Sequence, residues 1–288
     1  MALGSSSGER LRLGKIGYLN VLPIYYPLET GIISHPFTIV SGVPAHLNRL
    51  MAQGELELSV VSSIEYARCP ERYMILPDLS ISCRGAVRSV LLLSRTPVDQ
   101  LSGQTILVSS HSHTSVALLR ILLTTKLGME VTFRQGSCTQ ALTERQPPVA
   151  MLTIGDEALR IRDHVLYPYR WDLGEAWHAW TGLPFVFALW VIQRRALERR
   201  NGVLGEALES LAAAKAWGRS HLDEICWQAL REGILNSAQL QDYYQCLNYD
   251  LGEGEKRGME YFFYHLAALS EISRIPPLQI YSPLAWVA

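Results

Sequence analysis

The sequence has little net charge and no long hydrophobic run. Its 288 residues carry 26 Lys and Arg against 27 Asp and Glu, a formal net charge of -1. Such a balance gives no overall field to attract nucleic acid or a membrane surface. No apolar run reaches the roughly 18 residues of a membrane-spanning helix. We therefore expect neither nucleic acid nor a membrane as a partner, and an anionic ligand would need a local site.

Cysteine is scarce, and its spacing matches no common metal or disulfide framework. The 5 cysteines are scattered and include no C-x-x-C pair, which favours reduced thiols in a cytosolic protein. The N-terminal stretch MALGSSSGERLRLG has no long apolar segment, so we expect neither a signal peptide nor an anchor there. Its Gly and Ser content predicts a flexible tail over residues 1–10.

Motifs for dinucleotide, nucleophilic or metal chemistry are also missing. The glycines of GEGEKRG, residues 252–258, follow no predicted strand, which argues against a dinucleotide site. There is no G-x-S-x-G motif, and no cysteine is matched with a nearby histidine. His111 and His113 form an H-x-H pair without a third clustered ligand. We expect no metal and no cofactor.

Short apolar runs alternate with amphipathic stretches as far as about Arg194, the pattern of an α/β fold. The apolar runs predict eight strands, which are Leu13–Leu19, Phe37–Gly42, Leu56–Val61, Val87–Ser94, Thr105–Ser109, Val131–Arg134, Val149–Ile154 and Pro184–Ile192.

Helix start and stop signals are strong at two places. PAHLNRLMAQGE predicts a helix from Pro44 that stops at Gly54. TSVALLRILLTTKLG predicts another, with Thr114 or Ser115 as N-cap and Gly128 at its end. After Arg195 the sequence is helical by period, which predicts a C-terminal helical segment.

Pro and Gly near SRTPVDQLSGQ and WTGLPFVFALWV indicate two boundaries. The run between them has its own strands and helices and the size of a small α/β lobe. We therefore predict one lobe from residues 96–187 and a discontinuous lobe from 11–95 plus 188–288. The two crossings would act as hinges, with a ligand cleft between the lobes.

Small polar residues follow several predicted strands. Asn20 ends the first, Ser62 and Ser63 end the third, and Ser112 with its neighbours precedes a helix. Ligands of open α/β sheets bind at such strand ends, and helix N-termini bind anions. The alternative is that Asn20 satisfies turn groups and that the serines are plain N-caps. Several such ends in one chain favour a binding site.

Two later stretches add candidates. Gly155 and Asp156 follow a predicted strand, and Asp156 either caps a helix or orients a substrate hydroxyl. Trp180 and Thr181 lie close to the second crossing. Aromatic residues there serve either as hinge core or as a wall of the cleft.

Seven blocks in order carry a family resemblance, and they are IGYLNVLPIYYPLE, SGVPAHLNRLMAQGELELSVVSSIEYAR, LPDLSIS, VRSVLLLSR, HTSVALLRILL, IGDEAL and WTGLPFVFALW. Over about residues 15–190 the chain resembles the chorismate dehydratases of the menaquinone pathway. The resemblance implies the two-lobed α/β fold of type II periplasmic solute-binding proteins, here with a C-terminal helical segment, in a cytoplasmic enzyme.

The resemblance also implies a reaction. Chorismate would lose water to give 3-[(1-carboxyvinyl)oxy]benzoate, the first step of the futalosine route, without metal or nicotinamide. Asn20 and Ser89 match the family's pocket asparagine and serine, and Asp156 lies in its IGD block. These three are the expected catalytic residues. The expected substrate-binding residues are Ser62, Ser63, Ser112, Thr114, Ser115, Gly155, Trp180 and Thr181.

Several points stay open at the level of sequence. The general base is either Asp156 or the substrate's own enolpyruvyl carboxylate. Arg84 and Arg88, in a segment more basic than is usual in the family, either bind a substrate carboxylate or lie on the surface, and the surface is favoured for Arg84. The oligomeric state is not predicted.

Three other functions compete with the dehydratase. A carboxylate-binding protein of the same fold would ordinarily carry an export signal. The related enzyme acting on cyclic dehypoxanthine futalosine opens with a different segment, and GYLNVLP argues against it. A regulator sensing an aromatic-pathway acid would need a DNA-binding or partner domain, and no helix-turn-helix-like extension is visible.

Overall fold

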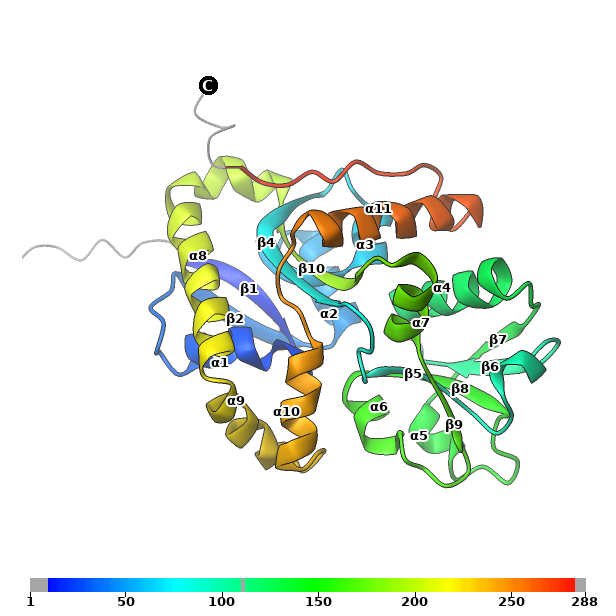
Figure 1. Cartoon of the computed structure of the whole chain (residues 1–288). Helices are drawn as coiled ribbons and strands as arrows, with labels where there is room; N and C mark the ends of the chain where they lie inside the picture. Colours follow the sequence, from blue (N-terminus) through cyan, green and yellow to red (C-terminus); the bar gives the residue numbers. More distant parts are fainter. Residues whose placement is uncertain (1–9, 110–111, 283–288) are drawn as a thin grey trace, which may run out of the picture.

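The computed structural model describes residues 10–109 and 112–282. The tail expected over residues 1–10 therefore falls, apart from Arg10, outside the described residues, as does His111. The described chain forms two sheets flanked by helices (Figure 1). Their strands are β1 Leu11–Ile16, β2 Phe37–Gly42, β3 Leu58–Ser62, β4 Tyr73–Cys83, β5 Val90–Ser94, β6 Thr105–Val108, β7 Thr132–Gln135, β8 Ala150–Ile154, β9 Tyr169–Asp172 and β10 Phe185–Gln193.

The two sheets share one plan. The first has the order β2-β1-β3-β10-β4, with β1 parallel to β2 and β3, and β10 antiparallel to β3 and β4. The second has the order β7-β6-β8-β5-β9, with β6 parallel to its neighbours and β5 antiparallel to its own. In each sheet the antiparallel inner strand follows the edge strand of the other sheet, so the chain crosses between the sheets twice.

The crossings do not coincide with the predicted boundaries. The sequence interpretation assigned Val90–Ser94 to the first lobe, but this strand pairs with β8 and β9 in the second sheet. The first crossing is therefore the segment between Cys83 and Val90. The return strand already joins the first sheet at Phe185, where it pairs with Cys83. The exact limits of the lobes remain a prediction that the sheet membership refines.

Two strands were not predicted from the sequence, and each has a physical reason. β4 contains Pro77 and Asp78, which are typical of turns, and in the structure both are exposed while the rest of the strand is buried. Asp78 takes a positive φ of 50° and kinks the strand. β9 is a short, partly exposed edge strand that pairs only with β5, so it lacks a buried apolar run.

The helix predicted from Pro44 is confirmed, whereas the N-cap predicted for the second helix, Thr114 or Ser115, is wrong because the chain is already helical at His113. α2 begins at Pro44, and the chain turns at Gly54 with φ 78°. α4 begins one residue before Thr114, with Ser112 as its N-cap, and passes at Ile121 into a π turn. The helices are α1 Leu22–Glu29, α2 Pro44–Gln53, α3 Ser63–Arg68, α4 His113–Ile121, α5 Cys138–Ala141, α6 Gly155–Ile161, α7 Leu173–Thr181, α8 Arg194–Ser220, α9 Leu222–Ala229, α10 Ser237–Cys246 and α11 Glu253–Ala268.

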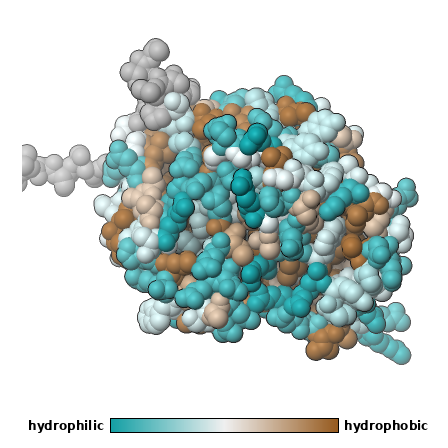
Figure 2. Space-filling view, viewed as in Figure 1, coloured by the Kyte–Doolittle hydropathy of each residue, from teal (hydrophilic) through white to brown (hydrophobic). Residues whose placement is uncertain are grey.

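The C-terminal helical segment is confirmed, and it packs on the first sheet and on α4 of the second lobe. α8 packs beside α1 and β4, α10 packs on α9, and α11 lies over β10, α3 and α4 (Figure 1). The segment therefore spans the junction of the two sheets. Figure 2 shows a mostly polar surface on this side, with apolar side chains in small separate patches. Within the described ranges, no helix has the length and apolar character needed to cross a bilayer.

Candidate active site

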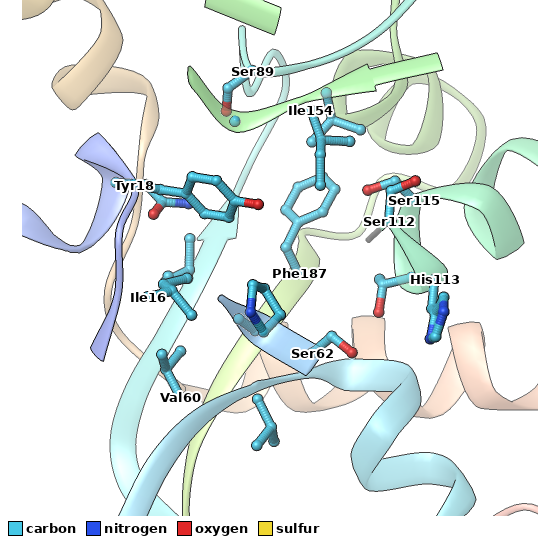
Figure 3. A pocket seen from close by; sticks show the side chains of 18 of the residues that line it. Ile16, Tyr18, Val60, Ser62, Ser89, Ser112, His113, Ser115, Ile154 and Phe187 are labelled. Carbon is cyan, nitrogen blue, oxygen red and sulfur yellow. The ribbon is translucent and has the colours of Figure 1, made fainter. Parts of the chain in front are cut away.

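A pocket lies where the two sheets face each other. Its cavity volume is about 150 Å³, and the pocket opens to solvent. Figure 3 shows Tyr18 on one side, the start of α4 on the opposite side and Phe187 between them. The lining residues are Ile16, Tyr18, Asn20, Pro44, Asn48, Val60, Val61, Ser62, Ile81, Val87, Ser89, Val90, Ser112, His113, Thr114, Ser115, Ile154, Gly155, Phe187 and Ala188.

Asn20 lines this pocket from a 3-10 turn, Leu19–Val21, and not from the end of β1. The predicted strand Leu13–Leu19 stops at Ile16 instead. The Asn20 side chain does not cap α1, whose N-cap, Val21, makes no side-chain cap bond. Its Oδ1 atom is buried and has no hydrogen-bond partner within the described chain. A buried acceptor without a partner is costly unless a ligand supplies the donor.

Ser89 lies on the first crossing, at the opposite end of the pocket from Ser62 (Figure 3). Its side chain is only 2% exposed. The hydroxyl of Tyr243 donates to Ser89 Oγ at 3.2 Å, and Ser89 Oγ donates to the Val87 carbonyl at a long 3.4 Å. The Ser89 carbonyl accepts from the Gly155 N–H at 2.7 Å, which ties the crossing to the start of α6.

The serine pair at the end of β3 splits between two roles. Ser62 lines the pocket and is the N-cap of α3, but its side chain makes no cap hydrogen bond. Ser63 does not line the pocket, because its hydroxyl donates to the Val186 carbonyl of β10. We therefore keep Ser62 in the candidate site and interpret Ser63 as a residue that fixes α3 to the sheet.

The start of α4 supplies one polar wall of the pocket. Ser112, His113, Thr114 and Ser115 all line it. Thr114 Oγ1 accepts from the Ile64 N–H at 3.2 Å, a bond that joins α4 to the other lobe. Ser112 Oγ donates to the Ser109 carbonyl at 2.9 Å. The first turn of a helix also offers N–H groups and positive partial charge to an anion.

Gly155 lines the pocket, whereas Asp156 does not. Gly155 has φ 57°, and a Cβ there would lie 3.2 Å from the Tyr18 ring, so glycine suits this contact. Asp156 Oδ1 accepts from the Leu19 N–H at 3.0 Å. Burial raises the pKa of this carboxyl group above its ordinary value, against the opposing effect of that hydrogen bond. Asp156 thus holds the turn that carries Asn20.

Two predicted binding residues lie away from the pocket. Trp180 packs in an aromatic cluster with Trp177 and His265, at ring distances of 5.9 and 5.1 Å. Thr181 Oγ1 donates to the Trp177 carbonyl at 2.9 Å and accepts from the Leu183 N–H. Both therefore stabilise α7 and its end, which matches the hinge-core alternative, and we leave them out of the candidate site.

The two arginines of the first crossing, Arg84 and Arg88, do not line the pocket either. Arg84 is exposed and does not line the pocket. The Arg88 guanidinium donates to Cys246 Sγ at 3.0 Å and to Asp242 at 3.2 Å, both on α10. The structure therefore favours structural or surface roles for both side chains over binding of a substrate carboxylate.

Four polar or aromatic lining residues were not assigned to the site from the sequence, and they are Tyr18, Asn48, His113 and Phe187. Burial raises the pKa of the Tyr18 phenol, and Asp156 adds to the effect, so this group is a neutral donor. His113 was weighed only as a metal ligand with His111. The sequence did contain one indication of Tyr18: it is a polar aromatic residue only two positions before Asn20, which was assigned to the site.

Most of the pocket surface is apolar, and the polar groups on it are almost all uncharged. Its described lining contains no Asp, Glu, Lys or Arg, so hydroxyls, amides and one imidazole supply the polar contacts. Among the described residues, no group of three or more His, Cys, Asp or Glu is placed to hold a metal ion. An anionic ligand would therefore be held by hydrogen bonds and helix N–H groups.

The two sheets, the double crossing and the pocket between them define a class of protein, the two-lobed fold of periplasmic binding proteins. The periplasmic aliphatic sulphonate-binding protein of Escherichia coli has this fold, with a TM-score of 0.68 and 12% identity over 96% of this chain and 93% of that one. A protein of Archaeoglobus fulgidus is similar with a TM-score of 0.74 and 18% identity, covering 93% of this chain and 100% of that one.

The chain belongs to the menaquinone biosynthesis family, which matches residues 11–268. It is 31% identical to a chorismate dehydratase of Thermus thermophilus, over 87% of this chain and 93% of that protein. A chorismate dehydratase of Campylobacter jejuni is also 31% identical, over 65% of this chain and 70% of that protein. A 1,4-dihydroxy-6-naphtoate synthase of Thermus thermophilus is 26% identical, over 88% and 93%.

Proposed function

We propose that this protein is a chorismate dehydratase, a carbon-oxygen hydro-lyase that converts chorismate to 3-[(1-carboxyvinyl)oxy]benzoate and water. The family and the two dehydratase relatives support this function. The observation that carries it is the buried, unpartnered Oδ1 of Asn20 in a pocket whose described lining has no Asp, Glu, Lys or Arg. The reaction would be the first step of the futalosine route to menaquinone.

The unpartnered acceptor fits the chemistry of chorismate. Both carboxyl groups of this substrate are ionised at neutral pH, so its ring hydroxyl is the O–H donor that remains for Asn20 Oδ1. That hydroxyl is also the leaving group. A hydrogen bond at this oxygen would fix the ring so that the departing group and the neighbouring C–H are aligned.

The start of α4 would receive the ring carboxylate. Loss of the ring proton from the carbon bearing the ether places negative charge that is delocalised into this carboxylate. The hydroxyl of Ser115 and the N–H groups of the first turn of α4 lie on the pocket wall and would stabilise that charge. Ser62 and Ser89 would hydrogen bond the other ring substituents from opposite ends.

The base is assigned by elimination within the described pocket. No protein carboxylate lines it, and Asp156 Oδ1 is already engaged by the Leu19 N–H. We therefore assign proton removal to the substrate's own enolpyruvyl carboxylate, held near the ring by the pocket. The proton that it takes and the departing hydroxide leave together as water. Asp156 then acts as a positioning residue for the Asn20 turn, and His113 is not required as a base.

The site calls for no cofactor, since proton removal and loss of a hydroxyl involve no change of oxidation state. Free cysteines, including buried Cys83, Cys138 and Cys226, and a biosynthetic substrate support a cytoplasmic location for the enzyme.

The proposal is tested by incubating purified protein with chorismate and following the product by mass. We expect a product lighter by one water. A protein that binds chorismate with unchanged mass would be a carboxylate-binding protein, and turnover of cyclic dehypoxanthine futalosine alone would identify the related naphthoate-forming activity. Either outcome would contradict the dehydratase.

A further inference from the structure

Three tyrosines of the C-terminal helical segment do not line the pocket, but their hydroxyls donate hydrogen bonds to residues at or next to it. Tyr243 and Tyr244 lie on α10 and Tyr249 follows it, with exposures of 0%, 4% and 5%. The Tyr244 hydroxyl donates to the Leu19 carbonyl at 3.1 Å, and the Tyr249 hydroxyl donates to the Asn20 carbonyl at 2.8 Å. Burial raises the pKa of all three phenols, which keeps them protonated as donors.

Tyr243 differs from the other two because it meets a side chain of the site. Its hydroxyl donates to Ser89 Oγ at 3.2 Å in a buried contact. A serine hydroxyl has one proton to donate and two acceptor positions. The phenol occupies an acceptor position, so the Ser89 proton is left to point at another acceptor. The protein acceptor available to it, the Val87 carbonyl, is a long 3.4 Å away.

The backbone around Ser89 is fixed by several hydrogen bonds, so the bond from Tyr243 can determine where the Ser89 hydroxyl proton points. Arg88 has a left-handed φ of 62°, which is uncommon for a residue with a side chain. Its N–H donates to the half-buried carboxylate of Asp172 at 2.7 Å, and Asp172 also accepts from the Val87 N–H and caps α7. The Arg88 side chain meets Cys246 and Asp242 on α10. α10 and the crossing are thus fixed to each other on both sides of the Tyr243 bond.

We propose that Tyr243 is a positioning residue for the reaction, whose phenol directs the Ser89 proton into the pocket toward the substrate. This inference rests on the proposed dehydratase function and deepens it, because it extends the machinery to a residue that does not line the pocket. The role is indirect: Tyr243 acts through Ser89 and touches no reacting atom.

The test is Tyr243→Phe, which removes the hydroxyl and keeps the ring, beside Tyr167→Phe as a matched control. Tyr167 is equally buried, and its hydroxyl donates to the Pro148 carbonyl at 2.9 Å, away from the pocket. We expect both variants to lower the melting temperature by a similar small amount. Only Tyr243→Phe should lower kcat/KM for chorismate, by about three- to tenfold, the effect of one neutral hydrogen bond.

A double-mutant cycle with Ser89→Ala separates positioning from mere folding, with slow variants measured under single-turnover conditions. Without the Ser89 hydroxyl, Tyr243→Phe should have almost no further effect on turnover. Unchanged kcat/KM in Tyr243→Phe, or an undiminished loss in the Ser89→Ala background, would overturn the inference while leaving the dehydratase intact. A wild-type protein that does not dehydrate chorismate would instead refute the proposed function, and the inference with it.

Discussion

Replacing Asn20 with alanine should lower turnover of chorismate without weakening the fold. The Asn20 Oδ1 atom is buried and accepts no hydrogen bond within the described chain, so the native state gains nothing from it without ligand. An unsatisfied buried acceptor costs about 1–3 kcal/mol. Its removal should therefore leave the free energy of unfolding unchanged or slightly higher, apart from the small loss of side-chain packing.

Catalysis should respond in the opposite direction. Without Asn20, the ring hydroxyl of bound chorismate would be a buried donor without a partner, which costs about 1–3 kcal/mol. Asn20→Ala should thus lower kcat/KM by roughly fivefold to over a hundredfold. The measurements are steady-state kinetics by product mass and thermal unfolding, both beside the wild type.

Asn236→Ala is the matched control, because Asn236 caps α10 and its Oδ1 accepts from the Gln239 N–H at 2.9 Å. Loss of such a cap costs about 0.5–2 kcal/mol of stability and should leave kcat/KM nearly unchanged. The two asparagines should therefore show opposite profiles. A clear stability loss with wild-type kinetics in Asn20→Ala would refute the reasoning and return Asn20 to a structural role.

Three further predictions follow from the site and the core. Asp156→Asn keeps an acceptor for the Leu19 N–H and should lower kcat by less than about tenfold, whereas a loss of about a hundredfold or more would identify Asp156 as the general base. Wild-type activity should survive a chelator, and a loss restored by a divalent ion would contradict this and revive His113 as a ligand. Burial lowers the pKa of His265 below 6.5, so the unfolded chain binds this proton more readily and stability should fall as the pH drops below about 6.5. Urea unfolding at about pH 7.5 and about pH 5.5 should show a smaller fall for His265→Phe than for the wild type, and equal falls would exclude His265 as the cause.

The elements predicted best from sequence are those whose signals are local. The bounds of the strand Phe37–Gly42 and the start and stop of the helix Pro44–Gln53 are as predicted, because alternation, Pro and Gly act over a few residues. β4 was missed because Pro77 and Asp78 interrupt its apolar run, and pairing with β10 on both sides of them continues the strand. The residues paired in this way, from Phe185 with Cys83 to Gln193 with Tyr73, are 102 to 120 positions apart, which no local pattern shows.

The residues of the candidate site also differ in whether a local sequence pattern predicts them. Asn20, Ser62 and the start of α4 were accessible from sequence because polar residues at strand ends and helix starts are a local pattern. Ser89 was identified only through the family resemblance. The Tyr243 bond to Ser89 spans 154 residues, and it depends on how the C-terminal segment folds back over the crossing. Spacing along the chain gives no indication of such a contact.

The most direct test of the dehydratase uses chorismate carrying deuterium on the carbon that bears the enolpyruvyl ether. Purified wild-type protein, with no added metal or nucleotide, should release an aromatic product without deuterium. The product should be lighter than the labelled substrate by one water that contains the deuterium. The product should form more slowly than from unlabelled chorismate if proton removal limits turnover. A product that retains the label, or chorismate recovered unchanged from a protein that binds it, would contradict dehydration at this pocket.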